Sequence, residues 1–168
     1  MRKFGIIFLA GFFFMQTLYG QSTLFVASNE KEFTDGMKFY KQGILGAARN
    51  AFENFLQSEN KKHKVRTLQT DQAEAYIALI ALQTYSADAE KLTSNAYTNI
   101  HNNSVRKLLA FHYAVYKFDK KQYKEAKEQF LKVDRADLTN DERISYQFKL
   151  GYIYFIEKNF AQARSLLS

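Results

Sequence analysis

A short pattern of apolar positions recurs four times along the chain. Each copy has an alanine three residues after one flanking position and four residues before another, and the flanking residues are mostly aromatic or aliphatic. Positions spaced by three and four lie on one face of an α-helix. The copies are Leu45-x2-Ala48-x3-Phe52, Ser86-x2-Ala89-x3-Thr93, Tyr123-x2-Ala126-x3-Phe130 and Phe160-x2-Ala163-x3-Leu167.

The alanines of these copies are 41, 37 and 37 residues apart. A period near 40 built from helical spacings predicts an all-α fold, a right-handed superhelical array of about four antiparallel helix hairpins. Where two helices cross closely one residue must be small, so we expect the alanines to be buried at the crossings. The expected repeat positions are Gly36, Ala48, Phe52, Ala89, Tyr123, Ala126, Phe130, Gly151, Tyr154, Phe160 and Ala163.

Turn and cap signals divide the chain into hairpins. We expect Gly43, Gly46 and Asn159 at turns and the charged segment 58–64 as a loop. Helices should start at Thr70 or Asp71, at Ser86, at Ser104, and at Thr139, where Glu142 completes capping-box spacing. In Asn102-Asn103-Ser104, a helix cap is favoured over glycosylation. The predicted helices are 30–42, 45–57, 70–82, 86–100, 104–119, 122–133, 139–157 and 160–168. The repeat domain is 21–168, with units at about 29–57, 70–101, 104–134 and 140–168, the last truncated.

Several of these segments resemble the tetratricopeptide repeat. Lys149-Leu150-Gly151-Tyr152-Ile153-Tyr154 followed by Asn159-Phe160-Ala161-Gln162-Ala163 resembles its two helices in order, and Gly36 to Phe52 matches well. The second unit departs from the pattern with Ile77 in place of Gly and Thr93 in place of an aromatic residue. The whole chain also resembles the N-terminal part of long exported Bacteroidota-type tetratricopeptide proteins. These resemblances imply a solenoid that binds other proteins.

The first twenty residues have the features of a secretory signal peptide. Arg2 and Lys3 supply the positive end, residues 4–15 are apolar, and Gly20 precedes a predicted cut at Gln21. The apolar run is shorter than the roughly 20 residues of a transmembrane helix, although an uncleaved anchor is the alternative. The pattern predicts an exported protein of the periplasm or the outer-membrane-associated envelope, with no transmembrane span after cleavage.

The chain carries a formal net charge of +7. Without residues 1–20 it keeps 22 basic and 17 acidic side chains, so the mature chain is about +5. Two runs concentrate the positive charge, and Glu125 and Glu128 interleave with the second, which favours a solvated helix face over an anion-binding surface. We expect no nucleic-acid partner. The runs are Lys61, Lys62, Lys64 and Arg66, and Lys117, Lys120, Lys121, Lys124 and Lys127.

The sequence offers little catalytic chemistry. The chain has no cysteine and only three histidines, and none of the histidines has a ligand spacing typical of a metal site. No phosphate-binding glycine loop or nucleophile elbow occurs. We therefore expect no enzyme activity, no cofactor and no metal.

By the resemblance, partner-facing residues lie on the first helix of each pair. The alternative for its phenylalanines is simple packing between neighbouring helices. The expected ligand is a protein or peptide with apolar side chains and an acidic group. The candidate binding residues are Tyr40, Lys41, Phe111, His112, Phe148, Lys149, Tyr152 and Phe155.

The leading hypothesis is an exported protein-interaction scaffold, part of a cell-envelope complex, that binds a partner segment in a concave groove. One alternative is the non-catalytic N-terminal region of an envelope enzyme. Another is a binder of an anionic envelope polymer through the lysine runs. The last pair, with Phe160, Leu166 and Leu167 at its edge, also predicts self-association.

Overall fold

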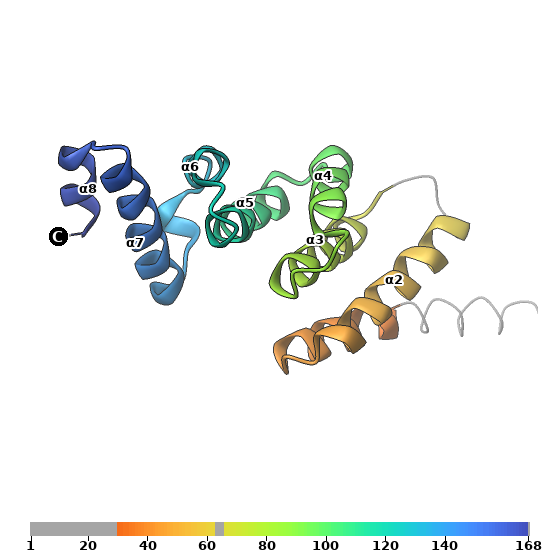
Figure 1. Ribbon diagram of the computed structural model, residues 1–168. Helices are drawn as coiled ribbons and strands as arrows, with labels where there is room; N and C mark the ends of the chain where they lie inside the picture. The colour runs from red at the N-terminus through yellow and green to blue at the C-terminus, as the bar shows by residue number, and fades with distance from the viewer. Residues whose placement is uncertain (1–29, 63–65, 168) are drawn as a thin grey trace, which may run out of the picture. The chain divides into compact units, whose positions relative to one another are not determined.

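The computed structural model describes residues 30–62 and 66–167, and within these ranges the regular secondary structure is helical, without strands (Figure 1). The chain divides into two compact units, Met1–Lys64 and Val65–Ser168. The predicted leader and its cleavage site lie outside the described residues. The all-α class expected from the apolar spacing is confirmed.

The first unit contains a helix over residues 30–41 and α2 (Leu45–Lys62). Gly36 lies against the ring of Phe52, because a Cβ atom at Gly36 would come within 2.7 Å of that ring. Phe33 packs on Phe52 and Phe55, with ring centroids 5.8 and 5.3 Å apart. The small residue and the three aromatic rings therefore hold this pair together.

Helix α2 continues five residues beyond the predicted end at residue 57, so the expected loop at 58–64 is wrong over residues 58–62. The segment is polar and charged, but Glu and Lys are good helix formers, and polarity alone does not end a helix. The side chains of Lys61, Lys62 and Lys64 lie outside the described residues.

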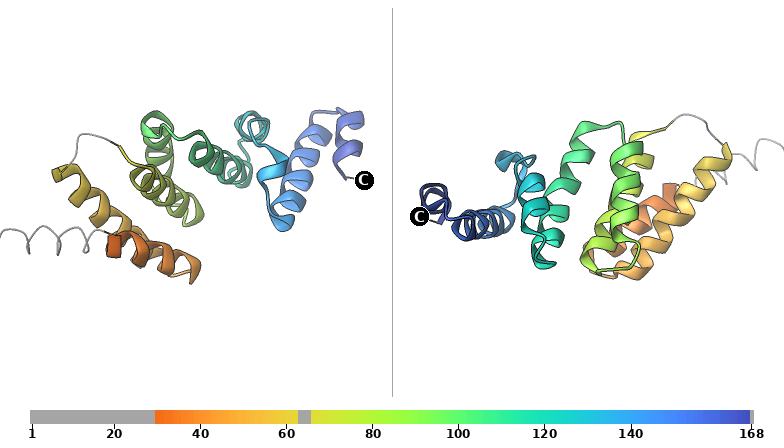
Figure 2. Two further views of the ribbon diagram at one scale, coloured as in Figure 1. Left: turned by 180° about the vertical axis from the view of Figure 1, so that it is seen from behind. Right: turned by 45° about the horizontal axis from the view of Figure 1, so that its top comes forward.

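The second unit contains three helix pairs in sequence, and the further views of Figure 2 show the same order. Each first helix packs against its own second helix and against the first helix of the next pair. A short 3₁₀ segment, η1 (Arg135–Asp137), lies between the second and third pairs. The pairs are α3 (Leu68–Gln83) with α4 (Ala89–Asn99), α5 (Asn103–Asp119) with α6 (Tyr123–Phe130), and α7 (Asn140–Ile156) with α8 (Phe160–Leu167).

Side-chain caps fix where the first helices begin. The predicted box at the start of α7 is confirmed, since the Thr139 hydroxyl accepts from the Glu142 amide and the Glu142 carboxylate accepts from Thr139. Asn102 caps α5 by accepting from the Val105 amide at 3.1 Å. The helix therefore starts at Asn103, one residue before the predicted Ser104, and the preference for a cap at this segment is confirmed.

Two other predicted starts are wrong. Helix α3 begins at Leu68 rather than at residue 70 or 71, because Thr67 and Thr70 form a reciprocal capping box. Helix α4 begins at Ala89, and the Ser86 hydroxyl bonds to the Asp88 carboxylate at 2.5 Å instead of capping the helix.

One turn geometry joins the two helices of every pair. The second residue after the first helix is left-handed in all four pairs, at Gly43 (φ 73°), Tyr85 (51°), Lys121 (60°) and Lys158 (62°). The next amide bonds to the carbonyl five residues back, as Gln122 does to Lys117 at 2.9 Å. This is the Schellman motif, which usually contains glycine at the left-handed position. Here only the first pair has glycine at this position, as Gly43. In the last pair the left-handed residue is Lys158, and Asn159 follows it.

The alanines of the repeated pattern are buried. Ala48, Ala89 and Ala126 are 0% exposed and Ala163 is 4% exposed. Thr93, which stands where the other copies have a larger residue, is also fully buried, and its hydroxyl bonds to the Ala89 carbonyl at 2.8 Å. A Cβ atom at Gly151 would lie 2.8 Å from Leu167, so α7 and α8 approach closely at this glycine. Helix α6 ends at Phe130, three residues before the predicted end.

Candidate functional site

A cleft of about 300 Å³ lies between α5, the segment that joins α6 to α7, and the first turn of α7. Its lining combines apolar side chains with charged and polar ones of both signs. The apolar residues are Leu108, Phe111, Val133 and Leu138, and the polar residues are Ser104, Lys107, His112, Asp134, Asp137 and Glu142.

Local structure explains why these side chains converge. The α5 residues that line the cleft stand three or four positions apart, which places them on one helical face. Asp134 caps η1 by accepting from the Ala136 amide at 3.0 Å, and this cap fixes the opposite wall. The capping box at Thr139 fixes the start of α7 and so the position of Glu142. The cleft is therefore built from two capped helix starts and one helix face.

Lys107 bridges the two aspartates across the cleft rim. Its ammonium group lies 3.4 Å from Asp137 Oδ2 and 3.7 Å from Asp134 Oδ2. All three side chains are largely exposed, so these ion pairs add little stability. They can rearrange at small cost when a charged ligand group enters.

His112 and Glu142 form the inner polar pair of the cleft. His112 Nε2 lies 3.6 Å from Glu142 Oε1, while Glu142 Oε2 accepts from the Thr139 amide at 2.9 Å and from its hydroxyl at 2.8 Å. Burial lowers the pKa of His112 below its ordinary value of 6.5, and the Glu142 charge opposes that shift. The imidazole is therefore neutral at pH 7 and offers one donor and one acceptor to a ligand.

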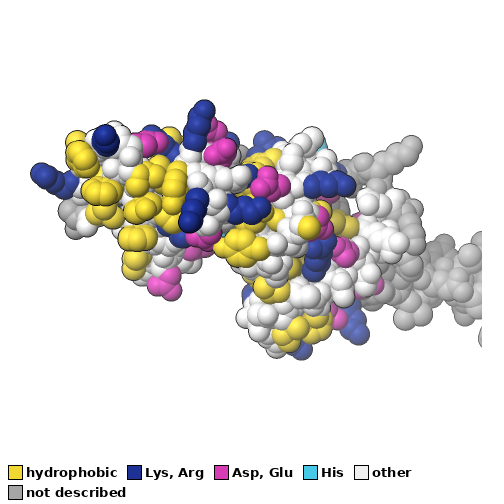
Figure 3. Space-filling view, in the orientation of Figure 1, with side chains coloured by type: hydrophobic (Ala, Val, Ile, Leu, Met, Phe, Trp, Pro, Cys, Tyr) yellow, Lys and Arg dark blue, Asp and Glu magenta, His cyan; other side chains and the backbone are white. Residues whose placement is uncertain are grey.

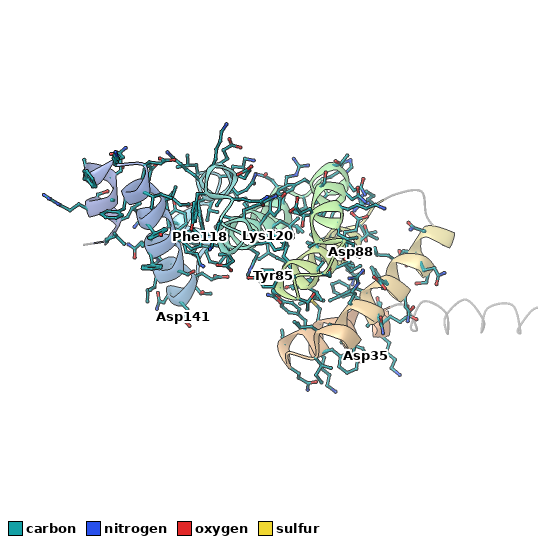
Figure 4. All side chains as sticks on the ribbon, in the orientation of Figure 1. Asp35, Tyr85, Asp88, Phe118, Lys120 and Asp141 are labelled. Carbon is teal, nitrogen blue, oxygen red and sulfur yellow. The ribbon has the colours of Figure 1, made fainter. Side chains whose placement is uncertain are left out.

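Aromatic and charged side chains also meet near the ends of the first helices, where Figure 4 labels Tyr85, Phe118 and Lys120. Asp119 accepts from the Tyr85 hydroxyl at 2.7 Å and from Lys149 at 2.7 Å. The hydrogen bond to Asp119, with burial, raises the pKa of Tyr85 to about 12. Lys120 lies 4.8 Å from the centroid of the Tyr116 ring. Asp119, the last residue of α5, therefore links that helix to the turn after α3 and to α7.

Two of the predicted binding residues belong to this linked region. Lys149 lies 4.4 Å from the centroid of the Phe118 ring, and Tyr152 packs edge-on to Phe118 and Tyr123 at 5.7 and 6.0 Å. Lys149 is thus held by Asp119 and Phe118 rather than projecting freely. Its substitution would change the packing as well as any binding.

The other predicted residues fall into three places. Phe111 is 5% exposed and belongs to a core cluster, and both Phe111 and His112 line the cleft. Phe148 and Phe155 are 59% and 55% exposed on α7. In the first unit Tyr40 is half-buried and Lys41 is exposed.

Of the residues that line the cleft, only Phe111 and His112 were predicted from the sequence. Spacing along α5 could have grouped Lys107 and Leu108 with His112, because they share one helical face. No local signal could have placed Asp134 and Asp137 opposite that face, since their position depends on the path between α6 and α7. The contact between Asp119 and Tyr85 was not predicted either, because it joins residues 34 positions apart in the sequence.

The lysine runs are largely neutralised where the structure describes them. Lys117 is 6% exposed and lies 3.0 Å from Glu90, which also faces Lys120 at 3.7 Å. Lys127 pairs with Glu157, and Arg66 pairs with Asp71 and Glu74. These pairs argue against an anion-binding surface, but the expected solvated face is wrong for Lys117, whose side chain is buried against Glu90.

Residues 30–62 and 66–167 contain no helix with the length and apolarity needed to cross a bilayer. The same ranges hold no cluster of three or more His, Cys, Asp or Glu side chains able to bind a metal ion.

Comparison of the chain with family models, curated proteins and solved structures found no significant match.

Proposed function

We propose that the chain is an exported, tetratricopeptide-like scaffold that binds a segment of a protein partner at the cell envelope. Three successive helix pairs with one turn geometry and buried crossing alanines support the repeat assignment. Arrays of this kind expose long surfaces between neighbouring repeats and are used for protein binding.

The cleft between α5 and α7 is the observation that carries the proposal. Its apolar floor and charged rim suit an apolar side chain anchored beneath polar contacts, which is the arrangement of an interface hot spot. His112, one of the residues expected to face a partner, lines it. A partner segment crossing the array would insert one side chain beside Leu108.

A charge placed on the cleft floor tests this proposal. Leu108 and Leu131 are both exposed leucines, at 38% and 59%, but only Leu108 lines the cleft. We expect Leu108→Glu to weaken capture of a partner from envelope fractions about ten-fold, because an ionised carboxylate would replace the apolar contact that the partner's side chain makes with the cleft. Leu131→Glu should leave capture unchanged.

Partners would be identified by mass after crosslinking from a photoreactive residue placed at position 108. Melting temperatures of both variants should stay close to that of the parent chain, since both side chains are exposed. Equal capture by the two variants would show that the partner binds outside the cleft.

A further inference from the structure

Large apolar side chains lie exposed on one face of the last helix pair. Phe148 and Phe155 on α7 are 59% and 55% exposed, and Phe160 and Leu167 on α8 are 57% and 52% exposed. Figure 3 shows hydrophobic side chains gathered over these two helices. Four such residues form an apolar surface of the kind that marks interaction sites. We call these four residues the outer face.

The two last helix pairs are related by a shift of 37 residues. The caps Asn102 and Thr139 are 37 residues apart, as are the left-handed residues Lys121 and Lys158. The buried alanines of α6 and α8 have the same separation. Each outer-face residue therefore has a counterpart on the α5–α6 pair. The counterparts of Phe148, Phe155, Phe160 and Leu167 are Phe111, Phe118, Tyr123 and Phe130.

All four counterparts are in contact with α7. Phe111 and Phe130 share one core cluster with α7, and Phe130 is 5.5 Å from the Tyr146 ring. Phe118 and Tyr123 pack edge-on to Tyr152. The outer face thus repeats, 37 residues later, a surface that a helix covers within this molecule.

The covering helix has a definable side-chain pattern. Helix α7 presents Tyr146, Leu150 and Ile153, which stand at positions i, i+4 and i+7. Helix α5 packs on α3 with residues 109, 113 and 116, which have the same spacing and stand 37 residues earlier. Two successive interfaces therefore use one pattern of apolar side chains.

A charge pair accompanies each of these interfaces. Glu90 of α4 faces Lys120, the residue that follows α5, at 3.7 Å. Lys127 of α6 pairs with Glu157, the residue that follows α7. The same position on α8, 37 residues after Lys127, is occupied by Arg164, which is exposed. A helix on the outer face would place its own corresponding residue opposite this guanidinium.

We infer that the outer face is a docking site for an amphipathic helix of a protein partner. That helix carries apolar side chains at i, i+4 and i+7 and a carboxylate at i+11, which pairs with Arg164. A folded second copy does not supply it from α5 or α7, because their inward residues, such as Leu109 at 0% and Leu150 at 2% exposure, are already covered.

The test uses the full chain and a labelled synthetic peptide with the sequence of residues 139–157. In this peptide Ile144, Phe148, Phe155 and Ile156 are replaced by serine, which removes the four most exposed large apolar side chains of α7 and keeps Tyr146, Leu150 and Ile153. We expect saturable binding by fluorescence anisotropy. Phe148→Ser with Phe155→Ser in the chain should weaken binding about ten-fold, because two anchor rings are lost.

A charge exchange tests the polar contact. Arg164→Glu in the chain should weaken binding several-fold, and a peptide with Glu157→Lys should restore it. The melting temperature should be unchanged in these exposed-site variants, and Leu131→Ser serves as an exposed control far from the outer face in sequence. Unchanged binding by the phenylalanine double variant would show that the peptide binds elsewhere and would overturn the inference. So would dimerisation of the chain through these residues without any peptide binding.

Discussion

The buried carboxylate of Asp71 accepts hydrogen bonds from two segments that are distant in the sequence. Its Oδ1 accepts from Arg66 at 2.9 and 3.0 Å, and its Oδ2 accepts from the amides of His101 and Asn102 at 3.1 and 2.9 Å. The residue is 4% exposed. Burial alone would raise the pKa of Asp71, but the hydrogen bonds from Asn102, Arg66 and His101 outweigh it, so the pKa lies below 3.8. The carboxylate thus ties the start of α3 to the start of α5.

We expect Asp71→Asn to lower the free energy of unfolding by about 2 to 4 kcal/mol, because one amide oxygen would replace the two carboxylate oxygens that accept from Arg66, His101 and Asn102. A depressed pKa in the folded state stabilises the protein above the unfolded value of about 3.9, and this contribution is lost as pH falls through the folded pKa. Urea unfolding between pH 7 and pH 3 should therefore show a shallower loss of stability for the variant. If the stability of the parent chain and of the variant fell equally with pH, this role of the Asp71 carboxylate would be contradicted.

At the scale of elements, the turns inside the pairs share a backbone geometry but not a residue type. A left-handed backbone costs a residue with a Cβ about 1 kcal/mol or more, and glycine avoids that cost. Tyr85, Lys121 and Lys158 all bear it. The surrounding hydrogen bonds and the packing of each pair hold these residues in place.

Glycine at Lys121 or Lys158 should therefore raise the stability by about 1 kcal/mol. Gly43→Ala should lower it by a similar amount, whereas Gly46→Ala should raise it by about 0.5 to 1 kcal/mol, because Gly46 lies within α2 and a Cβ there meets no atom within 4 Å. Chemical denaturation of the four single variants measures these signs. If Gly43→Ala stabilised the protein, the left-handed backbone at residue 43 would be refuted.

These elements also show which parts of the fold a sequence can predict. The Thr139 and Glu142 box has the residue types of the motif, so the start of α7 was predictable. The Thr67 box uses Thr70 in place of Glu or Gln, so the motif is not visible in the sequence and the predicted start of α3 lies two or three residues after the actual start. A lysine carries no preference for a left-handed backbone, so the turns at Lys121 and Lys158 could not be located to the residue. The buried alanines were predictable, because their spacing marks one helical face.

At the scale of the whole molecule, the second unit is held by interfaces between neighbouring elements. One core cluster includes Phe111 of α5, Phe130 of α6 and Leu150 of α7. Which phenylalanines are covered depends on the next helix along the array. Sequence reasoning could therefore propose Phe111 and Phe148 together as binding residues but could not separate the buried one from the exposed one.

We expect Ala126→Glu to cost several kcal/mol, because this fully buried site has no room and no partner for a carboxylate. The exposed change Lys124→Glu should have little effect. Hydrogen exchange should show lost protection across α5, α6 and α7 together, since they share a core cluster. Equal melting temperatures of the two variants would contradict the assigned register.

The 37-residue spacing of the last two turns, at Lys121 and Lys158, has a consequence for building longer proteins from this one. Residues 122–158 run from just after one left-handed residue to the next. A tandem copy of this segment, inserted after Lys158, would begin with a second helix and end with the same backbone geometry at which it started. The copy of α7 would then pack on the original α7, whose exposed residues match those that α5 presents to α7. The chain is thus extensible in steps of 37 residues, and each added step would transfer the exposed aromatic surface to the new terminus.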